Sequence, residues 1–173
     1  MKYKEALIES MKELAKDEKV IFIGEGMLEA NAIYSTLMVD KGRVIEFPVA
    51  ENLIVGSAIG LALMGYKPVV IFQRMDFMLC AADAIINHLS LLPRICPSIK
   101  LPVIIRAIVG SQSKKFWCGH QHTKDLTAFF DHYIDTIVLE KDTNIVEVYK
   151  LLKNEQRPKM IVEHKDLYNE ELV

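Results

Sequence analysis

The stretch from Arg43 to Tyr66 reads RVIEFPVAENLIVGSAIGLALMGY, and Lys67 and the run PVVIF follow it. RVIEF and PVVIF are short, apolar and β-branched, as strands are, whereas the segment between them is long enough for a helix. A strand, a helix and a second strand in this order predict a crossover between parallel strands. One carboxylate, Glu51, stands at the head of the helical segment, and the fifteen residues from Asn52 to Tyr66 carry no charge.

The same alternation continues along the whole chain of 173 residues. Six strands are predicted, over residues 20–24, 43–47, 68–72, 102–110, 136–140 and 159–164. Helices are predicted over residues 3–17, 29–38, 51–65, 77–91, 123–132 and 144–154. Several of the strands are apolar without interruption, which is typical of strands covered on both faces. We therefore expect one α/β domain over residues 1–173, with an open, mostly parallel six-stranded sheet and helices on both faces.

Composition restricts the possible partners. The chain holds 21 basic and 23 acidic residues, with a net charge of −2 and no basic block, which argues against nucleic acid and anionic membrane as partners. Its hydrophobic content of 51% is high for a monomer of this size. Such an excess indicates either a deeply buried parallel sheet or a surface that packs against another chain.

The sequence also predicts a compartment. Residues 1–19 have an amphipathic helical pattern with mixed charges, not the apolar core of a signal peptide, and no apolar run is long enough to span a bilayer. Cys80, Cys96 and Cys118 are odd in number and lack CxxC spacing. This pattern favours reduced thiols, so we expect a cytoplasmic protein.

Polar loops follow four of the predicted strands. They are GEGM from Gly24, PVAEN from Pro48, QRMDF from Gln73 and the long loop from Ser111 to Asp125. Ligands of parallel α/β sheets bind outside the carboxyl ends of the strands, so these loops predict a site. Arg74, Arg106 and Lys115 are candidates to meet an anionic substrate there, although each could equally be a solvated or paired charge.

Single motifs leave alternatives open. Glu51 in a first helical turn could simply stabilise the helix, by about 0.3–1 kcal/mol, through the unpaired N–H groups and the dipole. GEG at Gly24 lacks the third glycine and the acidic residue of a dinucleotide fingerprint. His120 and His122 form an HxH without further ligands at zinc spacing, which favours hydrogen bonding or acid–base work. We predict no metal site within this chain.

In combination, these segments resemble the pyrimidine-binding domain of thiamine diphosphate enzymes, in the form found in transketolases and 2-oxoacid dehydrogenase E1 β-subunits. The resemblance covers roughly Val20 to Tyr168. Its segments are VIFIGEGM, KGRVIEFPVAENLIVGSAIGLALMGYKPVVIFQRMDF, AADAIINH, LPVIIRAIVG and GHQHTKDL. The long central block keeps the P-x-x-E, G-x-A-x-G and G-x-x-P spacings in register, which makes it the most specific part.

The resemblance implies roles for five residues. A glutamate at the Glu51 position hydrogen-bonds a ring nitrogen of the cofactor's aminopyrimidine and so promotes deprotonation of the thiazolium carbon. Phe77 matches an aromatic that stacks on the pyrimidine, and Val49 an apolar residue beside the acid. His122 matches a histidine that handles protons of the substrate or intermediate. Cys80 stands where many E1 chains carry a polar amide on the pyrimidine side.

The resemblance implies no role for His120, and Trp117 could cover the mouth of the site or pack beneath the loop.

The resemblance further implies a partner. The family holds the diphosphate through Mg²⁺ on a second domain with a GDG motif, and this sequence contains neither that motif nor the carboxyl-terminal transketolase domain. We therefore expect a pyrimidine-binding subunit of a split enzyme, active with a diphosphate-binding subunit in an α2β2 heterotetramer and able to self-associate through the same domain. The expected substrate is a 2-oxo acid or a ketose, which the enzyme decarboxylates or from which it transfers an acyl or ketol group.

Two other hypotheses stay open at this point. The chain could be a non-catalytic interaction subunit of the same fold, which would bind no cofactor even with its partner. It could also be an unrelated flavodoxin-like domain that binds a nucleotide by itself.

Overall fold

A six-stranded sheet forms the centre of the molecule in the computed structural model, which describes residues 1–28, 33–113 and 117–173 and only the backbone of Tyr34. Its strands are β1 (Val20–Gly24), β2 (Val44–Glu46), β3 (Lys67–Phe72), β4 (Ile104–Val109), β5 (Thr136–Leu139) and β6 (Lys159–His164). Their order is β2-β1-β3-β4-β6-β5, and every neighbouring pair is parallel. The prediction of an α/β fold with a parallel sheet is confirmed.

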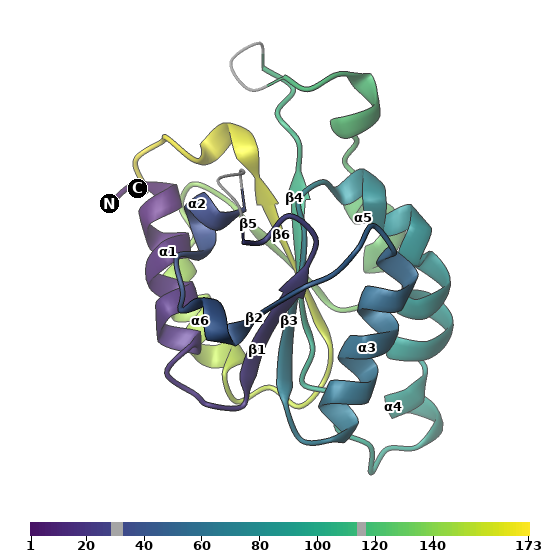
Figure 1. The fold of residues 1–173 in the computed structure, drawn as a ribbon. Coiled ribbons are helices and arrows are strands. Elements are labelled where there is room, and N and C mark those ends of the chain that lie inside the picture. The colour runs from purple at the N-terminus through teal and green to yellow at the C-terminus, as the bar shows by residue number, and fades with distance from the viewer. Residues whose placement is uncertain (29–32, 114–116) are drawn as a thin grey trace.

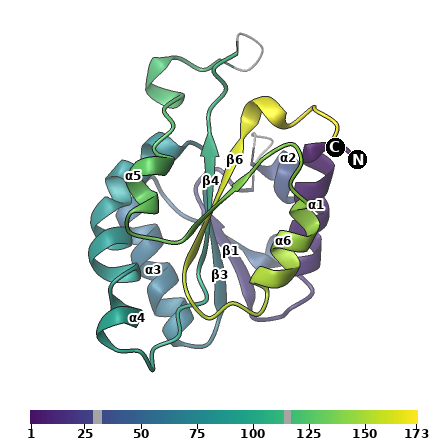
Figure 2. The same ribbon diagram turned by 180° about the vertical axis from the view of Figure 1, so that it is seen from behind.

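Helices cover both faces of this sheet (Figures 1 and 2). One layer holds α1 (Tyr3–Leu14), α2 (Tyr34–Leu37) and α6 (Ile145–Leu152), and the other holds α3 (Glu51–Leu63), α4 (Leu92–Ile95) and α5 (Thr127–Asp131). The two chain ends lie side by side, where Lys2 and Glu171 form an isolated bridge. All six strands point toward one edge of the sheet, so the loops that follow them share that edge.

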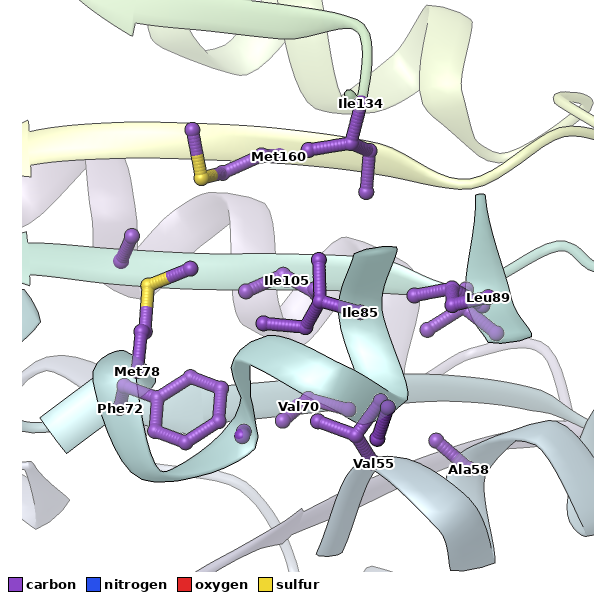
Figure 3. Packing of buried hydrophobic residues seen from close by; sticks show 14 of the residues in the cluster. Val55, Ala58, Val70, Phe72, Met78, Ile85, Leu89, Ile105, Ile134 and Met160 are labelled. Carbon is purple, nitrogen blue, oxygen red and sulfur yellow. The ribbon is translucent and has the colours of Figure 1, made fainter. Parts of the chain in front are cut away.

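Alternation along the strands divides the buried side chains into two cores. Ile105 and Ala107 of β4 join the core under α3, whereas Ile104 and Ile108 join the core under α1 and α6. Figure 3 shows the first core, where side chains of β3 and β4 pack against α3 and the segment that follows β3. Because both faces are covered, the strands need apolar residues at consecutive positions, which explains their uninterrupted apolar runs.

The predicted helix over residues 77–91 is not one α-helix. The chain forms a 3₁₀ helix over Met75–Ala81 and then a π-helix over Ala84–Leu89. The side-chain oxygen of Asn52 on α3 accepts a hydrogen bond from the N–H of Ala84 at 3.2 Å, at the break between the two. That N–H is therefore taken from the α-helical ladder by a residue distant in sequence.

Other helices are shorter than the sequence patterns predict. Only Tyr34–Leu37 of the predicted helix 29–38 is helical in the part of the chain that is described, since residues 29–32 lie outside it. The helix predicted over residues 123–132 is limited to α5, Thr127–Asp131. Helix α3 ends at Leu63, two residues before Gly65, whose φ of +89° suits a glycine after a helix end.

Within the described residues, no single helix has both the length and the apolar composition needed to cross a membrane. The segments Met75–Ala81 and Ala84–Ile95 meet those criteria only as a pair, and they are bent by 69°.

A buried ion pair links the two neighbouring strands β4 and β6. Nη2 of Arg106 donates hydrogen bonds of 2.7 and 3.0 Å to the carboxylate of Glu163, and both side chains are fully buried on the α1 and α6 side. Burial alone would lower the pKa of Arg106, but the carboxylate of Glu163 raises it, so the guanidinium stays charged. Of the two roles that the sequence left open for Arg106, a paired charge and a contact with an anionic substrate, the structure shows the paired charge, buried inside the domain.

We predict that Glu163→Gln lowers the free energy of unfolding by about 3–5 kcal/mol, because it leaves the buried Arg106 without a counter-charge. Urea denaturation of the isolated chain measures this loss. Glu170→Gln removes an exposed pair with Lys141 and should change stability by less than about 1 kcal/mol.

The double substitution Arg106→Met with Glu163→Leu should recover most of that loss, since no buried charge remains. A loss below about 1 kcal/mol for Glu163→Gln would contradict the role assigned to the pair.

Candidate functional site

Glu51 is the first residue of α3, and its side chain is buried although it is polar. Its exposed fraction is 8%, and it has no hydrogen-bond or ion-pair partner among the described residues. It lines a pocket of about 510 Å³ together with Ala50, Asn52, Leu53 and Cys80. A buried carboxylate without a partner is unfavourable, so this arrangement favours a ligand that supplies a hydrogen bond.

Two further carboxylates lie near Glu51, at the ends of β1 and β2. Glu46 accepts hydrogen bonds from the backbone N–H groups of Gly26, Met27 at 2.7 Å and Leu28 at 3.1 Å, and so orders the loop after β1. Burial raises the pKa of Glu25 in this loop, and the charges of Glu51 and Glu46 raise it further.

Glu25 was not predicted as a site residue, because the GEG segment resembles an incomplete nucleotide motif. Its position directly after a buried strand was the signal that could have marked it.

A second pocket lies at the end of β3. It has a volume of about 190 Å³ and is lined by Gln73, Arg74, Phe77 and His122. The rings of Phe77 and His122 meet edge to face, with centroids 5.5 Å apart and an interplanar angle of 84°. Nδ1 of His122 is buried without a hydrogen-bond partner among the described residues, so it can still donate to or accept from a ligand. The 3₁₀ helix Met75–Ala81 contributes to both pockets, with Phe77 here and Cys80 beside Glu51.

Gly110 determines where His122 lies. A Cβ atom on Gly110 would overlap the carbonyl oxygen of His122 and would lie 3.0 Å from its carbonyl carbon. The loop that follows β4 therefore folds back directly onto the end of that strand, in a space that only glycine leaves open. This contact helps to hold His122, twelve residues after Gly110, next to Phe77.

Two aspartates hold the same loop. Asp166, just after β6, accepts hydrogen bonds from the hydroxyl groups of Ser111 and Ser113 and from the N–H of Gln112 at 3.0 Å. Asp76 accepts from the backbone N–H and the ammonium group of Lys124, at 3.3 and 3.4 Å. The loop is thus held near its start and near its end, although its residues 114–116, including Lys115, lie outside the described residues.

The remaining predicted residues are less enclosed. Val49 is 79% exposed, two residues before Glu51, and Cys80 is exposed at the rim of the larger pocket. His120 contacts Trp117 edge to face, with ring centroids 5.5 Å apart, so the two histidines of the HxH have different aromatic neighbours. In the described part of the chain, no group of three or more His, Cys, Asp or Glu side chains is arranged to hold a metal ion.

We predict that Gly110→Ala displaces His122 from Phe77, because the added methyl group needs the space that the His122 carbonyl occupies. The ring-current shifts of the His122 imidazole protons in NMR spectra measure the displacement. Gly60→Ala is the matched control, since no atom of the described residues, apart from the nearby backbone of its own helix, lies within 4 Å of its Cβ position on α3. The control should leave these shifts unchanged and raise helix stability by about 0.5–1 kcal/mol. Unchanged His122 shifts in Gly110→Ala would contradict the close contact.

Comparison with known families gives a match over almost the whole chain. Residues 1–170 match the family model described as "Transketolase, pyrimidine binding domain". Among curated proteins, the "Pyruvate dehydrogenase E1 component subunit beta" of Cyanidium caldarium is 32% identical over 165 residues, which are 91% of this chain and 50% of that protein. The "Acetoin:2,6-dichlorophenolindophenol oxidoreductase subunit beta" of Cupriavidus necator is 30% identical, over 90% of this chain and 50% of that protein. The chain spans about half the length of these relatives.

Solved structures show the same fold. The structure titled "Split gene transketolase, inactive beta4 tetramer" superposes with a TM-score of 0.71 at 19% identity and covers 93% of this chain and 50% of that one. The transketolase of Campylobacter jejuni superposes with a TM-score of 0.72 at 16% identity, over 93% of this chain and 25% of that one. At these sequence identities, the structural similarity shows the fold alone.

Proposed function

Since the chain belongs to the family of transketolase pyrimidine-binding domains, we propose that it is the pyrimidine-binding subunit of a split thiamine diphosphate enzyme. Its substrate would be a 2-oxo acid or a ketose, and a separate diphosphate-binding subunit would complete the active site. Membership in this family removes the hypothesis of an unrelated flavodoxin-like domain. The non-catalytic subunit remains as the outcome that the first experiment below tests.

The position of Glu51 is the observation that carries this proposal. An exposed helix-capping acid would be stabilised by water and by the helix dipole, but Glu51 is 8% exposed and faces an open pocket of about 510 Å³. An aminopyrimidine ring offers the nitrogen that such a carboxyl group lacks as a partner. The residues of the pocket therefore fit the cofactor.

The site residues of this chain would have different roles in binding the cofactor and in proton transfer. Thiamine diphosphate, when bound, supplies the nucleophilic carbon that attacks a substrate carbonyl. Glu51 would share a proton with the pyrimidine ring, and Phe77, Val49 and Cys80 would bind its remaining surface. His122, with Nδ1 buried and unpartnered within the described residues, would hold or move a proton of the substrate.

Mg²⁺ and the diphosphate would be held mainly by the partner chain. Two relatives carry the word subunit in their names, and a structural neighbour is titled a split gene transketolase. These names support an assembly of two kinds of chain, which we propose to be α2β2. We propose the cytoplasm as its compartment.

The outer face of α3 is a candidate for the contact with a second chain. Leu53 and Leu63 are exposed there, as is Met64 directly after the helix, and Gly56 and Gly60 have no described atoms within 4 Å of their Cβ positions. No charge lies on this helix after Glu51, so the face can be buried without desolvating an ion. Since Glu51 begins the same helix, a chain packed on this face would also lie close to the candidate site.

The first experiment is a calorimetric titration of thiamine diphosphate and Mg²⁺ into this chain, into a GDG-containing chain encoded beside it, and into their mixture. Binding in the mixture but not in the separate chains is the expected result. Absence of binding in a complex that forms would overturn the proposal and favour a non-catalytic subunit.

We predict that Glu51→Gln lowers the rate of hydrogen–deuterium exchange at the reactive carbon of bound thiamine diphosphate by about 100-fold or more. The amide cannot share a proton with the pyrimidine as a carboxyl group does. Proton NMR of the assembled enzyme measures the rate. Glu147→Gln is the matched control, because Glu147 also stands in the first turn of a helix, α6, but is 53% exposed. Equal exchange rates in both variants would contradict proton sharing by Glu51 and would favour a helix-capping role.

We predict that Gly60→Leu prevents association with the partner chain, because a large side chain fills the space at which another backbone could approach α3. The fold of the isolated chain should be kept, since the Cβ position is open. Leu151→Gln on α6, in the opposite layer, is the control and should associate normally. Analytical ultracentrifugation of the mixture measures association, and an intact complex with Gly60→Leu would exclude this face as the interface.

A further inference from the structure

The segment Met75–Ala81, which contributes to both pockets, buries its side chains with the period of a 3₁₀ helix. Met75, Met78 and Ala81 recur at every third position, and all three are fully buried in the core under α3. A 3₁₀ helix turns by about 120° per residue, so side chains three residues apart lie on the same face. The core face of this segment therefore requires the 3₁₀ form.

Two site residues share another face of the same segment. Phe77 lines the smaller pocket, and Cys80 lines the larger pocket beside Glu51. They are also three residues apart, so the 3₁₀ turn gives their side chains the same direction. In an α-helix, which turns by about 100° per residue, the two directions would differ by about 60°. The alignment of Phe77 and Cys80 with the two pockets therefore depends on the 3₁₀ form.

A side chain of α3 binds the backbone at the point where this form ends. The N–H of Ala84 donates to Oδ1 of Asn52 at 3.2 Å, and Asn52 lines the larger pocket next to Glu51. In a continuous α-helix, the same N–H would donate to the carbonyl oxygen of Cys80. Because Ala84 is buried, its N–H needs an acceptor, and Asn52 supplies one. The bond to Asn52 therefore competes directly with an α-helical continuation through Cys80.

Asn144 shows the more common use of an asparagine near the start of a helix. It is the N-cap of α6, where its side-chain oxygen accepts from the N–H of Glu147 at 3.1 Å, within the same helix. Asn52 lies in the first turn of α3, yet its side-chain oxygen accepts from a different segment. Asn52 therefore links two elements, whereas Asn144 stabilises one.

We propose that Asn52 is a positioning residue of the candidate site. By holding the N–H of Ala84, it keeps the preceding segment in the 3₁₀ form. That form aligns Phe77 with the smaller pocket and Cys80 with the larger one. Asn52 acts through these two side chains and requires no contact of its own with a ligand.

The consequence for cofactor binding rests on the proposed function. Glu51 and Phe77 would contact the same pyrimidine ring, one from α3 and the other from the 3₁₀ segment. Asn52 stands next to Glu51, so its bond to Ala84 fixes the two elements relative to each other. Contacts that are already in place cost less free energy on binding than contacts that must first be ordered. We therefore expect weaker binding of the cofactor when this bond is lost.

NMR of the free, isotope-labelled chain tests the positioning role without cofactor or partner. Asn52→Leu keeps the shape of the side chain and removes the acceptor. It should shift the imidazole signals of His122, because the ring of Phe77 beside them turns away, and it should move the Cα shift of Cys80 toward α-helical values. Asn52→Asp has the same shape and keeps an acceptor, so it should retain the signals of the unaltered chain.

Asn144→Ala is the matched control for a loss of stability. It also removes a bond between a side chain and a backbone N–H, but in the opposite layer of helices, so its loss of stability should resemble that of Asn52→Leu. It should leave the His122 signals unchanged. A merely structural role of Asn52 predicts the same NMR result for both variants.

Calorimetry of the assembled enzyme tests the consequence for binding. Asn52→Leu should raise the Kd of thiamine diphosphate by about tenfold, the size expected for the loss of one hydrogen bond. Asn144→Ala should leave this Kd unchanged.

Unchanged His122 signals in Asn52→Leu would overturn the positioning role, as would equal shifts in Asn52→Asp or in Asn144→Ala. Shifted signals together with an unchanged Kd would overturn the link to cofactor binding. An assembled enzyme that binds no cofactor contradicts the proposed function, whereas the NMR result still decides whether Asn52 positions Phe77. The two failures are therefore distinct.

Discussion

Parallel strand pairing is the constraint from which the candidate site follows. Because all six strands run in one direction, every carboxyl end lies on the same edge of the sheet, and four loops that are far apart in the sequence meet there. The buried pair of Arg106 and Glu163 links β4 to β6 on the face opposite α3. The loop that carries His122 follows β4, so the pair stabilises a strand on which part of the candidate site is built.

Close backbone contacts turn this edge into two pockets. A Cβ on Gly24 would lie 2.6 Å from the carbonyl oxygen of Ile71, and Gly110 is in direct contact with the backbone of His122. The side chain of Gln73 adds a hydrogen bond of 3.3 Å to the carbonyl oxygen of Glu25, which joins the loop after β3 to the loop after β1. The position of each loop therefore depends on its neighbours, and small residues at the strand ends make this packing possible.

Charge is distributed unequally along the same edge. Glu25, Glu46 and Glu51 gather at the ends of β1 and β2, whereas Arg74 and Lys165 lie at the ends of β3 and β6. A ligand that spans the two pockets would meet the carboxyl group of Glu51 at one end and the guanidinium group of Arg74 at the other. Such a separation of charge orients a polar ligand and strengthens each interaction where water is excluded.

The sequence by itself determined the strands, the α/β class and the prominence of Glu51. Uninterrupted apolar runs can be satisfied only between two layers of helices, and an acid before fifteen uncharged residues stands out in any arrangement. The break between the 3₁₀ and π segments was not predictable, because the hydrogen bond found there comes from the side chain of Asn52 on another helix. The sequence also did not predict which groups the side chains of Arg106, Arg74 and Lys165 contact. Local sequence patterns indicate how buried a segment is and at what spacing its apolar residues recur. Only the strand order and register decide which charged residues, distant in the sequence, become neighbours.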